Sequence, residues 1–176
     1  MNSQEWHNQF KKVWDGAVQA WKDGRQSPSA MFGTEDALFL TSVGCSRQEM
    51  FDFVDDSQHY GEPDLQTALE VTDIRFRYFK EVMDGKPTGK EISMDNLPAK
   101  TDSVDGIEWL PRLIAKARAK LRGEMNADLM YGCGGDRPFL AKMNMTLPQF
   151  LQLTWDSGSD DRRIIETVKK HAGATV

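Results

Sequence analysis

An internal repeat is the feature that most limits how this chain of 176 residues can fold. The first copy contains Met31-Phe32-Gly33, Asp36 and Phe39-Leu40, and the second contains Met130-Tyr131-Gly132, Asp136 and Phe139-Leu140, with one residue inserted. The match continues further along the chain, where Ser46 aligns with Thr146 as an expected helix cap and Asp56 aligns with Asp156. Self-similarity of this kind indicates repeated structural units. We therefore predict a tandem duplication of a small four-helix unit.

Helical periodicity is present in both copies. From Ser3 to about Asp23, apolar residues recur at three- and four-residue spacings and share one face, namely Trp6, Phe10, Val13, Trp14, Ala17, Val18 and Trp21. A second amphipathic helix is predicted from about Glu108 to Arg122, with Pro111 in its first turn and Gly123 just past its end. An apolar stripe on a helix in a chain of this size is typical of a buried core face rather than of a membrane-surface helix.

The C-terminal part is predicted to hold two more helices. Thr146 is the expected N-cap of the first, with Pro148 in its first turn, and Ser159 or Asp160 is the expected cap of the second. No segment shows the sustained period-two alternation of a β-strand. The predicted fold class is therefore all-α.

The predicted domains follow the repeat. Residues 1–84 form the first, degenerate repeat, residues 85–106 form a linker rich in glycine, proline and charge, and residues 107–176 form the second repeat. Two copies are too few for a solenoid, so we expect them to pack with approximate two-fold pseudo-symmetry, as in a fused homodimer.

Composition limits the cellular context. With 39% hydrophobic and 28% charged residues, the chain has the composition of a soluble globular protein. It has neither a long apolar run nor a visible secretory signal, so we expect a cytoplasmic protein with no membrane partner. Its two cysteines, Cys45 and Cys133, are then expected to be reduced.

The net charge bears on the partners. A net charge of -5 argues against a duplex-binding surface, and we predict no nucleic-acid partner. A helix-turn-helix-like pair that binds DNA is the weakest of the alternatives left open. The expected oligomeric state is a monomer or a weak homodimer.

One stretch of the second copy resembles a known family. It consists of L-P-R-L-I-A-K-A-R-A-K-L-R-G, then M-Y-G-C-G-G-D-R-P-F-L, then S-D-D-R-R-I-I-E-T-V. This order resembles a bacterial family catalogued as a domain of unknown function, family 5069, clearest from Trp109 to His171. The resemblance implies an all-α fold and no established activity. The first copy fits it only in outline and lacks the cysteine.

Cys133 is the candidate catalytic residue. A thiol near a helix N-terminus with bases nearby could act as a nucleophile or a redox centre. No histidine lies close to it in the sequence, where the chain has only His7, His59 and His171. The alternative is a small, half-buried residue that fills a turn.

The acids and glycines of the repeated turn have a structural interpretation. Asp36 and Asp136 occur in both copies, so we expect them to cap helices rather than to take part in catalysis. The glycines Gly132, Gly134 and Gly135 match no nucleotide-binding motif. They are expected to supply the positive φ angles of a tight turn.

A basic strip is the strongest functional signal. Arg112, Lys116 and Lys120 are spaced by four residues along one flank of a helix, and Gln9, Val13 and Ala17 replace them in the first copy. If the turn folds over this flank, a small pocket for a carboxylate or phosphate would form. The ligand-binding residues predicted there are Arg112, Lys116, Tyr131, Cys133 and Asp136. The alternative is a solvated helix face paired with acids.

These observations favour a binding or interaction module with a small anionic ligand, or a protein partner, at the second repeat. The alternative function is a small thiol-dependent enzyme or redox protein that uses Cys133. Neither interpretation calls for a metal or a cofactor, because the chain has no Cys-x-x-Cys or His-Glu-x-x-His motif.

Overall fold

The computed structural model describes residues 3–173, which form two compact units divided between Phe76 and Arg77. The first contains α1 (Ser3–Lys22), α2 (Pro28–Met31), α3 (Thr34–Ser42), α4 (Arg47–Tyr60) and most of α5 (Leu65–Glu81). The second contains the 3₁₀ helix η1 (Met94–Asn96), β1 (Ser103–Val104), β2 (Ile107–Glu108), α6 (Leu110–Arg122), α7 (Asp136–Lys142), α8 (Leu147–Ser157) and α9 (Asp161–Gly173). The boundary between the units therefore falls within α5.

The long N-terminal helix agrees with the sequence pattern. It runs from Ser3 to Lys22, and Trp6, Phe10 and Val13 on its predicted apolar face are buried. This face packs against α4, which contributes Met50 and Phe53 to the same core. Burying large apolar side chains in this way is the main source of stability for such a unit.

Both predicted caps at aligned positions of the repeat are confirmed. The Ser46 hydroxyl accepts a hydrogen bond from the Glu49 N–H at 3.0 Å, and the Glu49 carboxylate accepts from the Ser46 N–H at 2.9 Å. Thr146 and Gln149 make the same reciprocal pair at the start of α8. Reciprocal pairs of this type satisfy two N–H groups that a helix start leaves unpaired. At α9 the cap is Asp160, which accepts from the N–H of Arg163 at 3.1 Å.

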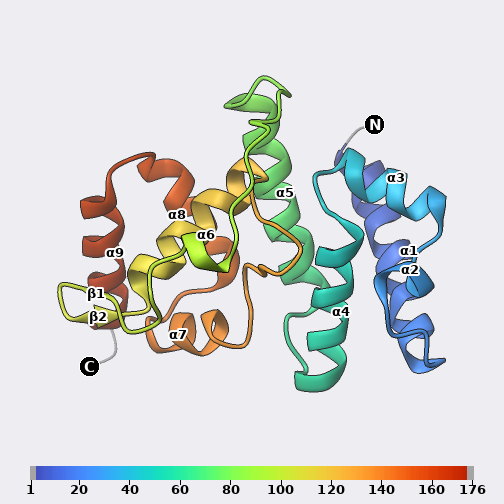
Figure 1. Ribbon diagram of the computed structural model, residues 1–176, viewed down its shortest axis with the longest axis horizontal. Coiled ribbons are helices and arrows are strands. Elements are labelled where there is room, and N and C mark those ends of the chain that lie inside the picture. Colours follow the sequence, from blue (N-terminus) through green and yellow to red (C-terminus); the bar gives the residue numbers. More distant parts are fainter. Residues whose placement is uncertain (1–2, 174–176) are drawn as a thin grey trace. The chain divides into compact units, whose positions relative to one another are not determined.

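The second unit is organised around α6, which packs against α8, with α9 on α8 (Figure 1). Its core includes Leu113, Ala117, Phe150, Leu151 and Ile164. The first turn of α6 differs from the sequence-based expectation, because the helix begins at Leu110 and not at Glu108.

Trp109 precedes the helix with a φ of 72°, and Glu108 belongs to β2. At the other end the prediction is confirmed. Gly123 ends α6 with a φ of 67°, a conformation that glycine adopts without steric cost.

The all-α prediction is approximately right, and one short hairpin is the exception to it among the described residues. Strands β1 and β2 pair in antiparallel fashion through Ser103 with Glu108 and Val104 with Ile107. The turn between them is Asp105-Gly106, and both residues have positive φ, 51° and 78°. Asp-Gly is a strong signal for a two-residue hairpin turn, but strands of two residues are too short to show an alternating pattern. The described residues are thus mostly helical, with one small two-stranded sheet.

The segment predicted to be a linker has contacts of its own in the second unit. The Ile92 N–H donates to the Glu124 carbonyl at 2.7 Å, and the Asn126 N–H donates to the Ile92 carbonyl at 3.0 Å. Leu97 is buried, with 9% of its surface exposed. Within residues 3–173, no helix is both apolar enough and long enough to cross a bilayer.

Candidate functional site

The side chains of Lys116 and Trp109 meet at the carboxylate of Asp136 in the second unit. The Lys116 ammonium lies 2.5 Å from Oδ2 of Asp136, and the Trp109 indole N–H donates to Oδ1 at 2.9 Å. The backbone N–H of Gly132 also donates to Oδ2, at 2.9 Å. Cys133 completes the group, with its Sγ 3.2 Å from the Lys116 nitrogen. We refer to these residues as the Asp136 cluster.

The Asp136 cluster is shielded from solvent. Asp136 is 0% exposed and Lys116 is 3% exposed, whereas Cys133 is partly exposed. Removing two charges from water is costly unless they pair closely and keep further hydrogen bonds. Here the carboxylate has three donors, so its charge is fully compensated inside the protein.

The glycines of the turn make this packing fit. Gly132 has a φ of 92°, and a Cβ atom there would lie 2.7 Å from a methyl carbon of Leu147. A Cβ atom on Gly135 would lie 2.3 Å from the Trp109 ring, which is far inside contact distance. The predicted positive φ therefore applies to Gly132 but not to Gly134 or Gly135. Gly135 is small because an indole ring lies against its backbone.

Tyr131 lies beside the cluster and is held by a backbone contact. Its hydroxyl donates to the Leu147 carbonyl at 2.8 Å. Complete burial raises the pKa of the Tyr131 phenol well above its usual value, and the negative charge of Asp136 raises it further. The phenol therefore stays protonated and serves as a fixed hydrogen-bond donor.

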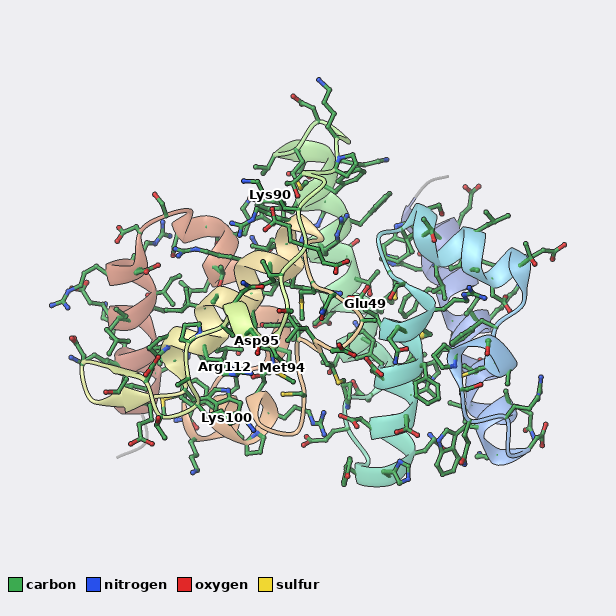
Figure 2. All side chains as sticks on the ribbon, in the orientation of Figure 1. Glu49, Lys90, Met94, Asp95, Lys100 and Arg112 are labelled. Carbon is green, nitrogen blue, oxygen red and sulfur yellow. The ribbon has the colours of Figure 1, made fainter. Side chains whose placement is uncertain are left out.

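Arg112 contacts a different part of the unit. Its guanidinium donates to the Pro98 carbonyl at 2.7 Å and to the Met94 sulfur at 3.1 Å, and it lies 6.0 Å from the centre of the Trp109 ring. Figure 2 shows Arg112 next to Met94. The structure thus brings Lys116, Tyr131, Cys133 and Asp136 together, while Arg112 tethers the segment before the hairpin.

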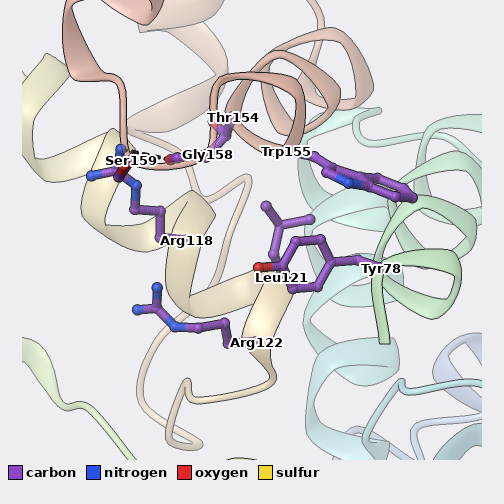
Figure 3. Close-up of a pocket in the computed structure, with 8 residues that line it drawn as sticks. All are labelled: Tyr78, Arg118, Leu121, Arg122, Thr154, Trp155, Gly158 and Ser159. Carbon is purple, nitrogen blue, oxygen red and sulfur yellow. Dashed lines mark hydrogen bonds between the residues drawn. The ribbon is translucent and has the colours of Figure 1, made fainter. Parts of the chain in front are cut away.

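A cavity of about 410 Å³ lies on the neighbouring flank of α6 (Figure 3). We refer to it as the α6–α8 cavity. It is lined by Tyr78, Arg118, Leu121, Arg122, Thr154, Trp155, Gly158 and Ser159. In Figure 3 the guanidinium groups of Arg118 and Arg122 lie on the left and the rings of Tyr78 and Trp155 on the right.

The polar and aromatic groups of the α6–α8 cavity are held by local contacts. Arg118 donates from Nη2 to the Gly158 carbonyl at 2.9 Å and pairs with Asp161, and Arg122 pairs through Nε with Glu124 at 2.8 Å. The Tyr78 and Trp155 rings meet edge to face, with their centres 5.6 Å apart. The four-residue spacing of the two arginines was visible in the sequence, but their nearness to an aromatic pair was not.

A second cavity, of about 310 Å³, lies in the first unit among α1, α2 and α3. We refer to it as the α1–α3 cavity. It is lined by Gln9, Lys12, Val13, Gly16, Ala17, Arg25, Met31, Phe32 and Asp36. Gln9, Val13 and Ala17 are the residues that the repeat aligns with the basic strip of the second copy. The sequence predicted a pocket at the basic strip, whereas this cavity lies at the positions that the sequence alignment pairs with that strip.

Metal ligands do not gather in residues 3–173, where no group of three or more His, Cys, Asp or Glu side chains could hold an ion.

Comparison with protein families bears on the second unit. Residues 96–175 match the family model described as Domain of unknown function (DUF5069). The resemblance seen from Trp109 to His171 is thereby confirmed, and the DUF5069 match begins earlier, at Asn96, so that it includes Pro98, which accepts from Arg112. The Asp136 cluster lies within the DUF5069 segment, as does the α6–α8 cavity apart from Tyr78. Comparison with curated proteins and with solved structures found no match.

Proposed function

We propose that this chain is a binding module whose second unit holds a small organic anion in the α6–α8 cavity. The observation that carries the proposal is the pairing of two guanidinium groups, one helical turn apart on α6, with the aromatic pair Tyr78 and Trp155 in one cavity. Guanidinium groups bind carboxylates and phosphates through parallel N–H donors. Aromatic rings favour a flat apolar group on the same ligand.

The two arginines of this cavity have N–H donors that do not contact other described residues. A guanidinium has five N–H donors, and the contacts with other described residues use Nη2 of Arg118 and Nε of Arg122. In the Asp136 cluster, by contrast, the Lys116 ammonium is engaged by a buried carboxylate. Anion binding at Arg112, Lys116, Tyr131, Cys133 and Asp136 stays a prediction from sequence. Because these side chains already contact other groups of the protein, we favour the α6–α8 cavity as the anion site.

Calorimetric titration of the full chain with phenyl phosphate and with inorganic phosphate tests the proposal. Phenyl phosphate should bind more tightly, because its ring can contact Tyr78 or Trp155. Replacing the arginine in Arg122→Gln should weaken binding by about tenfold, which corresponds to about 1.4 kcal/mol. Arg162→Gln is the matched control, since Arg162 lies on α9 outside the cavity and is mostly exposed. Absence of binding, or equal weakening by both variants, would count against the site.

Thiol chemistry at Cys133 is the second candidate. It is favoured by the 3.2 Å approach of the Lys116 ammonium to Sγ and by the partial exposure of Cys133. A nearby cation stabilises a thiolate, which is the reactive form of cysteine. The cytoplasmic location, the absence of a nucleic-acid partner and the monomeric or weakly dimeric state rest on the sequence and stay predictions.

We also infer that the two units arose by duplication. Capping boxes begin α4 and α8 at aligned positions, Ser46 and Thr146. The acid of each repeated turn accepts from the glycine N–H before it, at 3.3 Å for Asp36 and at 2.9 Å for Asp136. These shared contacts support a common origin.

A further inference from the structure

We propose that the α1–α3 cavity of the first unit is a second binding site, for a free α-amino acid with an apolar side chain. The proposal is independent of the anion site in the second unit. It rests on the charges around this cavity, on its apolar floor and on a glycine that no packing contact explains.

The charged side chains at the cavity make few hydrogen bonds or ion pairs with the described residues. The side chains of Lys12 and Gln9 make no hydrogen bond or ion pair with any residue from 3 to 173, and the Arg25 side chain has only an exposed pair with Asp23 at 3.6 Å. Asp36 accepts one hydrogen bond, from the Gly33 N–H through Oδ2. The cavity thus offers two cations and one carboxylate, a set that complements a ligand carrying both a carboxylate and an ammonium group.

The aligned aspartate of the second unit, Asp136, pairs with an ammonium group. There the Lys116 ammonium pairs with Asp136, the residue that the repeat aligns with Asp36. The repeat aligns Lys116 with Val13, so the first unit has no built-in ammonium at that place. A ligand amine beside Asp36 would supply the same charge pair. This step rests on the duplication inferred above.

The floor of the cavity suits an apolar side chain. Val13, Ala17, Met31 and Phe32 line part of it, and each keeps between 2% and 7% of its surface exposed. A volume of about 310 Å³ lies at the lower end of the range for small-molecule sites. Together, the apolar floor and the charged rim fit an amino acid of the size of leucine or methionine.

Gly16 supplies an observation of another kind. It lies in the interior of α1, where glycine is less favourable than alanine. A Cβ atom at Gly16 would meet nothing within 4 Å, so packing does not require a glycine there. The missing side chain instead leaves the cavity open on its helical side.

Calorimetric titration of the full chain with L-leucine tests the proposal. L-leucine should bind, and both L-leucinamide, which lacks the carboxylate, and N-acetyl-L-leucine, which lacks the ammonium, should bind at least about tenfold more weakly. Asp36→Asn should weaken leucine binding by a similar factor, while its amide oxygen can still accept from Gly33.

The cavity itself is tested by Gly16→Leu, which fills it and improves the helix propensity of α1. Leucine binding should be lost, whereas the exposed neighbour Asp15→Leu should leave it within about twofold. Gly16→Leu should also leave phenyl phosphate binding in the second unit unchanged, which separates failure of this site from failure of the other. No binding of L-leucine, equal binding of L-leucinamide, or unchanged binding by Gly16→Leu would each overturn the proposal.

Discussion

Lys116 and Asp136 form an ion pair that is closed off from solvent, with Nζ 2.5 Å from Oδ2 and exposed side-chain fractions of 4% and 0%. Replacing Lys116 by methionine would keep most of the side-chain volume but leave the carboxylate without its counter-charge. We expect Lys116→Met to lower the free energy of unfolding by about 3–5 kcal/mol, the usual cost of breaking a buried pair from one side. Urea unfolding followed by circular dichroism measures this.

Lys142→Met is the control for that prediction, because Lys142 is an exposed lysine of α7. It should change the stability by no more than about 0.5 kcal/mol. The double variant Lys116→Met/Asp136→Asn should regain part of the loss, because a neutral amide replaces the unpaired charge. Equal stability of the two single variants would show that the pair does not support the fold.

Two adjacent glycines give a matched test of the turn. Gly135→Ala would push a methyl group into the Trp109 ring, and we expect it to destabilise the protein by about 1–3 kcal/mol. Gly134→Ala should have little effect, because a Cβ atom there meets nothing within 4 Å. Thermal unfolding of both variants would decide the matter, and similar midpoints would mean that Trp109 does not lie against this backbone.

Asp52 on α4 gives a prediction about pH. Burial raises the pKa of its carboxyl from 3.8 to about 6, and the nearby charges of Asp56, Glu49 and Asp55 add to the rise. Since the folded state binds the proton more tightly than the unfolded state, ionised Asp52 lowers stability above about pH 6. This cost disappears as the pH falls through about 6 toward 3.8.

Asp52→Asn should therefore raise stability at about pH 8, by on the order of 1 kcal/mol after allowance for solvent screening, and should have no effect at about pH 3.5. The amide can still accept the hydrogen bond that Gln48 donates to Asp52 at 2.8 Å. Asp64→Asn, at an exposed cap of α5, is the control and should show no gain at the higher pH. A gain that does not depend on pH would rule out titration of Asp52 as its cause.

The two cysteines should differ in reactivity. Cys133 is partly exposed and Cys45 is 1% exposed, so iodoacetamide should alkylate Cys133 first in the folded protein. Lys116→Met removes the ammonium group that lies 3.2 Å from the Cys133 sulfur, so a variant that is still folded should be alkylated more slowly. Mass spectrometry of timed samples measures both rates. If Cys133 is alkylated no faster in the wild type than in Lys116→Met, the thiol interpretation has no support.

Much of the helical fold could be predicted because its signals are local. The spacing of Trp6, Phe10 and Val13 predicted α1, and the hydroxyls of Ser46 and Thr146 predicted two helix starts. Caps and periodicity depend on residues within one or two turns of each other. For the same reason the helix after Trp109 was placed within two residues of its start.

The candidate site was harder to predict, because it depends on contacts between distant segments. The sequence placed Lys116 on the correct flank beside Cys133 and Asp136. It could not show that the ion pair would be buried, with its carboxylate already bonded inside the protein, because Trp109 donates to Asp136 from 27 residues away. The α6–α8 cavity brings Tyr78 and Trp155 together from still more distant segments, and no local pattern encodes that.

The most direct test of the anion site follows the five tryptophan indole N–H signals by nuclear magnetic resonance as phenyl phosphate is added. Trp155 lines the α6–α8 cavity, whereas Trp109 belongs to the Asp136 cluster. We predict that the Trp155 signal shifts with a saturable dependence on ligand, and that Arg122→Gln weakens this shift. Movement of the Trp109 signal with a stationary Trp155 would place the ligand at the Asp136 cluster instead. No movement of either signal would contradict an anion site in the second unit.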